Sequence, residues 1–468
     1  MKSLLRATGP TVGQMVLPFE DWTMCNNTGY RCHSYSKAFQ LVSMSSPRQY
    51  LRPIGVDLFA GAGGLSLGFE QAGFDVVAAV EIDPVHCGVH EYNFPHTAVI
   101  CESVAKLTGK EIRARSGIDA KEIDCVFGGA PCQGFSMIGK RVLDDPRNQL
   151  VFHYVRLVEE LQPKYCVFEN VKGLTVGNHK KFLAELIEAL EGVGYKVLLP
   201  YKVLNAADFG VPQDRKRLFL IAARAGQMLP EYPEPISEKV TVWDAIADLP
   251  NADEFDELVA SDSVRTKFKT KAAYAKILRG LVADPLDYSY ARHFDQDLLT
   301  GSFRTDHTAI SRQRFANTKH GKIEPISRFL RLDPEGLCNT LRAGTDSARG
   351  AFTSPRPIHP YHPRVITVRE AARLHSYPDW FRFHATKWHG FRQIGNSVPP
   401  LLGRAVAGQI IKALGVTPEK PRQNFMLNTD DSVLKYDMSK AAHYFGVPAT
   451  VIAQRTRKSD TIKDVMNG

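Results

Sequence analysis

The chain has 468 residues, of which 44% are hydrophobic and 23% are charged. This composition is typical of a globular protein with about two or three domains, and it excludes a disordered or fibrous chain. The formal net charge of +9 favours a polyanionic partner such as nucleic acid, although charge alone is equally consistent with simple solubility. The 8 cysteines contain no CxxC pair and the 15 histidines no HExxH motif, so we expect no metal site. The sequence contains neither an apolar run long enough for a membrane span nor a signal peptide, so we expect a cytoplasmic protein.

Residues 1–52 form a polar extension, and from residue 53 short apolar runs alternate with helical patterns. Expected strands lie at 54–59, 75–80, 97–100, 125–127, 165–168, 197–203 and 218–222, and expected helices at 65–72, 84–93, 145–161 and 179–193. Gly73 is a good residue for ending a helix, and Asp83 before Pro84 is a good residue for starting one. Strands that alternate with helices predict a doubly wound α/β sheet.

The regular alternation stops near residue 224. Residues 225–360 are rich in charge and loop residues, which predicts a second, smaller, irregular and basic domain, although a lysine run also fits a solvated helix face. Helices are expected again at 368–374 and 401–414, the latter with small residues on one face. In the last stretch, 438–455 matches the spacing of a helix-turn-helix, but a packing hairpin is the favoured interpretation.

One cysteine follows the buried strand 125–127 on a turn of small residues and proline. Cys132 in this position would be presented as a nucleophile, because a rigid turn exposes the thiol. The alternative is a small packing residue, which is the commoner role of a cytosolic cysteine beside glycines.

A glycine-rich turn, residues 60–64, follows the first strand. Glycines at this place let the backbone approach a ligand closely, and Glu81, 20 residues beyond Gly61, lies where an acid can accept both ribose hydroxyls. The turn is not GxGxxG, and the sequence contains no GK[ST] phosphate loop. A nucleoside ligand without phosphates, such as S-adenosylmethionine, therefore fits best.

Charged residues follow or precede two further strands of the expected sheet. Glu169 comes directly after strand 165–168, at the end that faces the ligand crevice, although a surface glutamate with an asparagine cap is the alternative. Arg215 and Arg217 point to one side of a strand. Two guanidiniums beside a catalytic thiol would favour the thiolate and bind a carbonyl oxygen or phosphate, whereas a random basic patch would mean little.

Taken together, these motifs resemble the DNA (cytosine-5)-methyltransferase family. The resemblance rests on ordered segments at 57–64, 81, 131–136, 169–171, 213–217, 369–374 and 395–399, and it covers roughly 54–414. It implies the Rossmann-like sheet of S-adenosylmethionine-dependent methyltransferases. It also implies cofactor contacts from Phe59, Gly61, Gly63, Gly64, Glu81, Ile82, Ser103, Val104, Pro131, Leu150, Asn396, Ser397 and Val398.

The resemblance also assigns chemical roles and domains. It implies that Cys132, Glu169, Arg215 and Arg217 are catalytic, with Cys132 attacking C6 of a flipped cytosine in duplex DNA. The residues implied to contact DNA are Gln133, Ser136, Ile138, Lys140 and Arg141. The implied domains are a catalytic domain at 53–224, a target-recognition region at 225–360, a return to the catalytic domain at 361–416 and a C-terminal extension at 417–468.

The sequence departs from the family at one place and leaves several alternatives open. Ser103 stands where the family usually has an acid that contacts adenine, which predicts altered cofactor affinity. An RNA cytosine-5 methyltransferase would carry the same motifs, and 438–455 would suit a DNA-binding regulator. We expect a monomer and no metal, and a restriction enzyme acting on the same site is the expected genetic partner.

Overall fold

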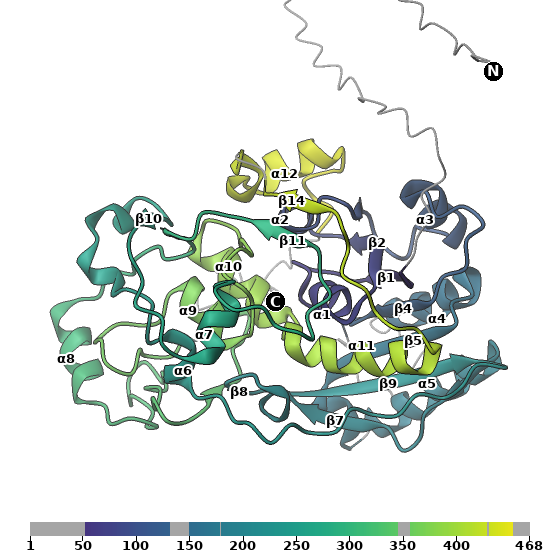
Figure 1. Cartoon of the computed structure of the whole chain (residues 1–468), viewed down its shortest axis with the longest axis horizontal. Helices are drawn as coiled ribbons and strands as arrows, with labels where there is room; N and C mark the ends of the chain where they lie inside the picture. The colour runs from purple at the N-terminus through teal and green to yellow at the C-terminus, as the bar shows by residue number, and fades with distance from the viewer. Residues whose placement is uncertain (1–51, 132–148, 178, 345–355, 428–429, 453–468) are drawn as a thin grey trace, which may run out of the picture. The chain divides into compact units, whose positions relative to one another are not determined.

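The central sheet follows the alternating pattern of the sequence. The computed structural model describes residues 52–131, 149–177, 179–344, 356–427 and 430–452. One sheet within these residues contains β1 (Ile54–Leu58), β2 (Asp75–Glu81), β3 (Ala98–Cys101), β4 (Cys125–Gly128), β5 (Tyr165–Val171), β6 (Tyr195–Val197), β7 (Lys202–Asn205) and β9 (Lys216–Arg224). The strands lie in the order β3-β2-β1-β4-β5-β9-β6, and β7 also pairs with β9 (Figure 1).

The direction of the strands determines where a ligand can bind. β3, β2, β1, β4 and β5 are parallel, whereas β9 runs antiparallel to β5, β6 and β7. The strand order reverses at β1, because β1 lies between β2 and β4. Ligands of such sheets bind outside the carboxyl ends of the strands at the point of reversal. Leu58 and Gly128, which are neighbours at these ends, therefore mark the crevice.

Helices cover both faces of the sheet, as the doubly wound prediction requires. Outside residues 225–360, the described α-helices are α1 (Gly64–Ala72), α2 (Pro84–Asn93), α3 (Gly109–Ser116), α4 (Gln149–Leu161), α5 (His179–Gly192), α9 (Val368–Leu374), α10 (Lys387–Asn396), α11 (Pro400–Leu414) and α12 (Met438–Phe445). α3, α4 and α5 share one apolar cluster with the sheet, and α1 and α11 share another. On β4, Val126 enters the first cluster and Phe127 the second, so the strand is buried on both faces. No helix among the described residues is long and apolar enough to cross a membrane.

Local sequence signals set the ends of the first two helices. α1 begins after Gly63, whose φ is 99°, and ends at Gly73, whose φ is 114°; both values lie in the region that favours glycine. The Asp83 side chain accepts a hydrogen bond from Val85 N at 3.0 Å and caps α2. These boundaries agree with the predicted ones to within one residue.

α11 is far from α1 in the sequence but packs directly on it. The contact is close because glycines face each other: a Cβ on Gly68 would lie 2.7 Å from Arg404 N and from Pro400 O. Gly403 lies in the same contact, because a Cβ on Gly403 would lie 3.4 Å from Gly68 Cα. The small residues predicted on one face of this helix therefore let two helix backbones touch.

Residues 225–360 contain only short elements in the part that the structure describes. They are α6 (Val242–Ile246), α7 (Ala273–Leu278), α8 (Ala309–Asn317), the 3-10 helices η5 (Ala252–Glu254) and η6 (Asp256–Val259), and the strands β10 (Val264–Arg265), β11 (Ala291–His293), β12 (Leu298–Leu299) and β13 (Cys338–Asn339). β10 pairs with β12, β11 with β14 (Asn424–Met426), and β13 with β8 (Gln213–Asp214). One apolar cluster joins Val242 and Leu341 to Leu67 of α1 and Val89 of α2, so this irregular region packs on the helices around the crevice.

Two expectations about strands were wrong. The predicted strand 197–203 is interrupted, and β6 and β7 lie on either side of Pro200, which has no N–H for a sheet hydrogen bond. Glu169 and Asn170 do not follow β5 but belong to it, because they pair with β9. The antiparallel partner extends the strand beyond its apolar run.

Of the helix-turn-helix considered at 438–455, the described residues contain the first helix but not the second. α12 begins after Asp437, whose side chain caps it, and ends at Gly446 with φ 67°. Residues 447–452 contain turns and no helix, and residues 453–455 lie outside the described part of the chain. α12 packs instead on α2 (Figure 1).

Candidate active site

The glycine turn after β1 opens onto a cavity at the carboxyl end of the sheet. Phe59 leaves the strand with φ 67°, and Gly61 follows with φ 55°. A Cβ on Gly61 would have no heavy atom within 4 Å, whereas a Cβ on Gly64 would lie 2.5 Å from both Tyr377 Oη and Val398 O. Gly61 therefore leaves room for a ligand, and Gly64 allows the segment around Val398 to approach the turn.

Glu81 ends β2 and its carboxylate is fixed across the turn. Oε2 accepts a hydrogen bond from Gly61 N at 2.8 Å, and Oε1 accepts one from Asp83 N at 2.8 Å. Each carboxylate oxygen keeps a further lone pair for a ligand. Behind it, Asp57 accepts a hydrogen bond from Ser66 Oγ at 2.6 Å, and burial raises the pKa of Asp57 to about 8.

The cavity has a volume of about 1070 Å³ and gathers residues from distant parts of the chain. Of the predicted cofactor residues it is lined by Phe59, Gly61, Gly64, Glu81, Ile82, Ser103, Val104, Pro131, Leu150, Asn396, Ser397 and Val398. Gly63 does not line it, because a Cβ there would collide with the ring of Phe94 behind the turn. The sequence did not predict the contributions of Asp83, His86, Trp388, Arg392, Val451 and Ile452.

An acid and an arginine meet at the other end of the same cavity. Glu169 of β5 and Arg217 of β9 form an ion pair, with Nε 2.9 Å from Oε1. Burial raises the pKa of the Glu169 carboxyl, and the positive charge of Arg217 opposes this rise. A Cβ on Gly129 would lie 2.5 Å from Glu169 Oε2, so the carboxyl touches the backbone of the turn that leads to Cys132.

Cys132 itself lies outside the described residues, as do Gln133, Ser136, Ile138, Lys140 and Arg141. The described chain before it ends at Pro131, which lines the cavity. The turn is held in place because Asn170 Nδ2 donates a hydrogen bond to Ala130 O at 2.9 Å. The asparagine after Glu169 thus ties β5 to the turn that carries the cysteine.

Arg215 lines the same cavity, and its guanidinium binds backbone carbonyls. It is fully buried, and its Nη1 and Nη2 donate to Leu341 O at 2.8 Å, Gly395 O at 2.8 Å and Ser397 O at 2.7 Å. Burial holds the pKa of Arg215 below its ordinary value. Sequence reasoning placed both arginines beside the thiol and missed this second role, which fixes the end of α10, where Asn396 lies.

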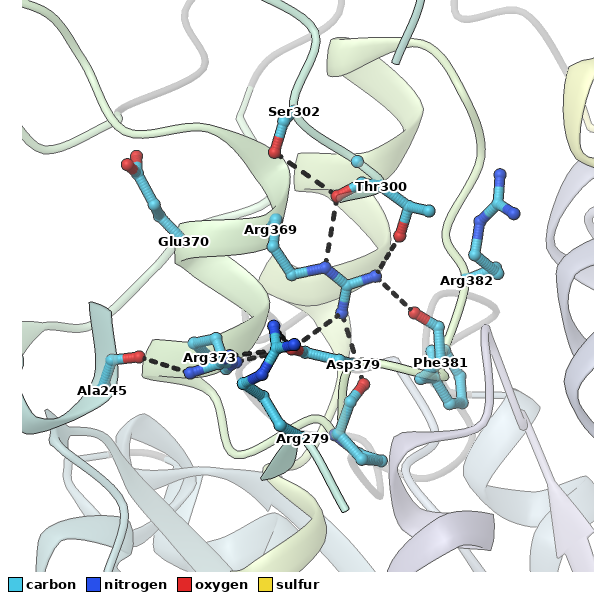
Figure 2. A network of polar contacts seen from close by, with 12 residues as sticks. Ala245, Arg279, Thr300, Ser302, Arg369, Glu370, Arg373, Asp379, Phe381 and Arg382 are labelled. Atoms are coloured by element: carbon cyan, nitrogen blue, oxygen red, sulfur yellow. Dashed lines mark hydrogen bonds and ion pairs between the residues drawn. The ribbon is translucent and has the colours of Figure 1, made fainter. Parts of the chain in front are cut away.

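The two arginines of α9, Arg369 and Arg373, bind the scaffold and do not line the cavity. Figure 2 shows Arg369 and Arg373 converging on Asp379, with Arg373 Nε 2.5 Å from Asp379 Oδ1. Arg373 also donates to Ala245 O at 2.9 Å, and Arg369 donates to Thr300 Oγ1 at 2.6 Å. The motif at 369–374 therefore connects α9 to the irregular region 225–360.

Among the described residues, no group of three or more His, Cys, Asp or Glu is arranged to hold a metal ion. The cavity has glycines and Glu81 at one end, and Glu169 and Arg217 at the other. The first suits a nucleoside, and the second suits a polar heterocycle.

Comparisons with known proteins identify the family of the chain. The profile of the family described as C-5 cytosine-specific DNA methylase matches residues 55–412. The Type II methyltransferase M.XorII of Xanthomonas oryzae pv. oryzae is 64% identical over 409 residues, which cover 87% of this chain and 96% of that protein. M1.HphI of Haemophilus parahaemolyticus is 36% identical over 363 residues, which cover 76% of this chain and 86% of that protein.

A solved structure gives the same result for the fold. A crystal structure described as a DNA modification methyltransferase encoded within an E. coli prophage has a TM-score of 0.65 and 37% identity, and it covers 78% of this chain and 100% of its own. The fold and the family profile agree on one assignment. The chain belongs to the C-5 cytosine-specific DNA methylase family and is a DNA (cytosine-5)-methyltransferase of the restriction–modification type.

Proposed function

We propose that the methyl donor is S-adenosylmethionine and that methyl transfer proceeds through a covalent bond between Cys132 and C6 of a flipped cytosine. The observation that carries this proposal is the single cavity with Glu81 at one end and the Glu169–Arg217 ion pair at the other. A cofactor and a base bound at these two ends would meet in the middle, beside Pro131 and the cysteine that follows it.

The cofactor end fits an adenosine-containing ligand. Glu81 offers lone pairs for the ribose hydroxyls, and the open space over Gly61 admits a ligand close to the backbone. Ile82 and Leu150 give the cavity apolar walls, which suit a purine ring. S-adenosylmethionine supplies an electrophilic methyl group on a sulfonium when bound.

The base end fits a cytosine. C5 of cytosine is a poor nucleophile. Addition of the Cys132 thiolate to C6 would convert C5 into an enamine carbon, which can attack a methyl group. The raised pKa of Glu169 suits a group that shares a proton with N3 and binds the exocyclic amine. Arg217 would hold O2. Methylation of C5 would leave S-adenosylhomocysteine. Transfer of the C5 proton to water and cleavage of the C6–sulfur bond would then release 5-methylcytosine and the Cys132 thiolate.

Arg215 has a different part in this scheme. We assign it a positioning role, because its guanidinium nitrogens bind the carbonyls of Leu341, Gly395 and Ser397. It would hold Asn396 and Ser397 beside the cofactor, while Arg217, two residues further along the chain and on β9, would face the base.

DNA binding would bring the target base into the cavity. C6 is inaccessible within a stacked duplex, so the cytosine has to be extruded. We assign the basic region 225–360 to target recognition and assign DNA contacts to the segment 133–141 that follows Cys132. Binding through phosphates would be salt-dependent. We also infer that the enzyme is cytoplasmic and monomeric, and that its partner is a restriction endonuclease of the same specificity.

The test is Cys132→Ala in the full chain. The variant should bind duplex DNA with unchanged affinity but transfer no labelled methyl group, and it should form no denaturation-resistant adduct with DNA that contains 5-fluorocytosine. Cys32→Ala, in the N-terminal extension, is the matched control and should retain both activities. Turnover of Cys132→Ala at the wild-type rate would eliminate the covalent mechanism.

A further inference from the structure

The C-terminal segment, residues 421–452, lies beyond the region that the methylase family profile matches, which ends at residue 412. Two of its last described residues, Val451 and Ile452, nevertheless line the active-site cavity. We propose that this segment completes the cofactor site and that Val451 and Ile452 form an apolar wall against S-adenosylmethionine. The inference rests on the proposed function, because it takes S-adenosylmethionine as the ligand.

The segment is first anchored at β14. β14 pairs in parallel with β11, with Phe425 opposite Arg292. The ring of Phe425 lies 5.1 Å from that of His96 and 5.2 Å from that of Tyr290, measured between centroids. This contact fixes the start of the segment beside the edge of the sheet that contains β3.

The segment next crosses α2 through a short 3-10 helix, η8 (Ser432–Lys435). A Cβ on Gly88 of α2 would lie 2.8 Å from Val433 Cγ2, so the glycine makes room for the crossing chain. Leu434 is fully buried, and its carbonyl accepts a hydrogen bond from Ala385 N at 2.9 Å. The segment is therefore packed against the folded domain at this point.

After η8 crosses α2, α12 packs on α2 as well (Figure 1). Ala441 and Ala442 are buried. Burial and the neighbouring Glu91 of α2 raise the pKa of Tyr444 to about 12. Three successive parts of the segment thus hold it in place before it reaches the cavity.

The position of α2 indicates which end of the cavity Val451 and Ile452 serve. α2 starts at Pro84, directly after Ile82 and Asp83, which line the cavity, and His86 in its first turns lines it too. Three strand spacings separate β2 from β5, which carries Glu169, or roughly 14 Å at the usual spacing. A segment that packs on α2 therefore belongs to the cofactor end. Its two apolar side chains suit a nucleoside better than a phosphate.

The experiment uses the full chain with the double substitution Val451→Ser and Ile452→Ser. Isothermal calorimetry would measure the Kd for S-adenosylhomocysteine and for S-adenosylmethionine, and fluorescence anisotropy would measure the Kd for duplex DNA without cofactor. Loss of the apolar contact should weaken cofactor binding by roughly five- to tenfold. DNA affinity and the Tm of the cofactor-free protein should not change. Ala449→Ser, at an exposed position of the same segment, is the control and should match wild type.

The outcomes separate this inference from the function on which it rests. Unchanged cofactor affinity in the double variant would overturn the inference while leaving the proposed function intact. Weaker DNA binding with unchanged cofactor affinity would also overturn it, because the two side chains would then face the base. Wild-type protein that binds neither cofactor form would instead refute the proposed methyl donor.

Discussion

The buried ion pair between β11 and α1 offers a prediction with a calculable size. Both side chains, Arg292 and Glu70, have 0% exposure, and both terminal nitrogens of Arg292 bind the carboxylate, with Nη2 2.8 Å from Oε2. Arg292→Met removes the positive charge but keeps an apolar stem beside Trp380. Breaking a buried pair from one side costs about 3–5 kcal/mol, because the remaining charge stays buried. We expect a loss of about 3 kcal/mol, at the lower end of this range, because His96 Nε2 still lies 3.1 Å from Glu70 Oε2.

The pH dependence distinguishes this electrostatic cost from a packing defect. Burial raises the pKa of Glu70, but Arg292 and then His96 outweigh burial and lower it well below its ordinary value. A lowered folded pKa gives stability that is present above the unfolded value of about 4.3 and lost as the pH falls. Without Arg292, burial prevails and the pKa of Glu70 rises. The difference in stability between wild type and variant should therefore shrink from about pH 8 to about pH 5.

Urea unfolding followed by circular dichroism at several pH values would measure this. Arg265→Met is the matched control, because Arg265 is 74% exposed and forms a surface ion pair with Asp295 at 2.6 Å. Such surface pairs contribute about 0–1 kcal/mol. The reasoning would be refuted if Arg292→Met lost no more stability than the control, or if its loss did not vary with pH.

Three further changes probe the site. Glu81→Ala should weaken S-adenosylmethionine binding by at least about tenfold in calorimetry, because charged hydrogen bonds of about 1.5–3 kcal/mol are lost; an unchanged Kd would contradict the ribose contact. Gly128→Ala should prevent stable folding, because its Cβ would collide with a carbonyl of β1, whereas Gly408→Ala meets open space and should keep the wild-type Tm. Arg217→Met should reduce kcat and, because Arg217 lowers the pKa of Glu169, move the alkaline limb of the pH–rate profile upward. An unmoved limb would show that the two side chains are not coupled in catalysis.

The sequence by itself determined the elements whose rules are local. Gly73 and Asp83 end and start helices through their own backbone and side-chain preferences, so the boundaries of α1 and α2 were predictable. The alternation of strands and helices likewise fixed the sheet type. The position of Glu81 followed from the strand pattern at 75–80 and from its spacing to Gly61. In the structure, Glu81 Oε2 accepts a hydrogen bond from Gly61 N.

Only the tertiary structure decided what required partners far along the chain. Strand alternation put Arg215 and Arg217 on one side, but Arg215 binds carbonyls at Leu341 and Gly395, more than 120 residues away, and no local pattern encodes that contact. Glu169 lies within β5 because an antiparallel neighbour extends the strand. Ile452 reaches the cavity only through the packing of the C-terminal segment on α2. Local propensity sets where elements begin and end, whereas packing between distant segments sets which side chains share a cavity.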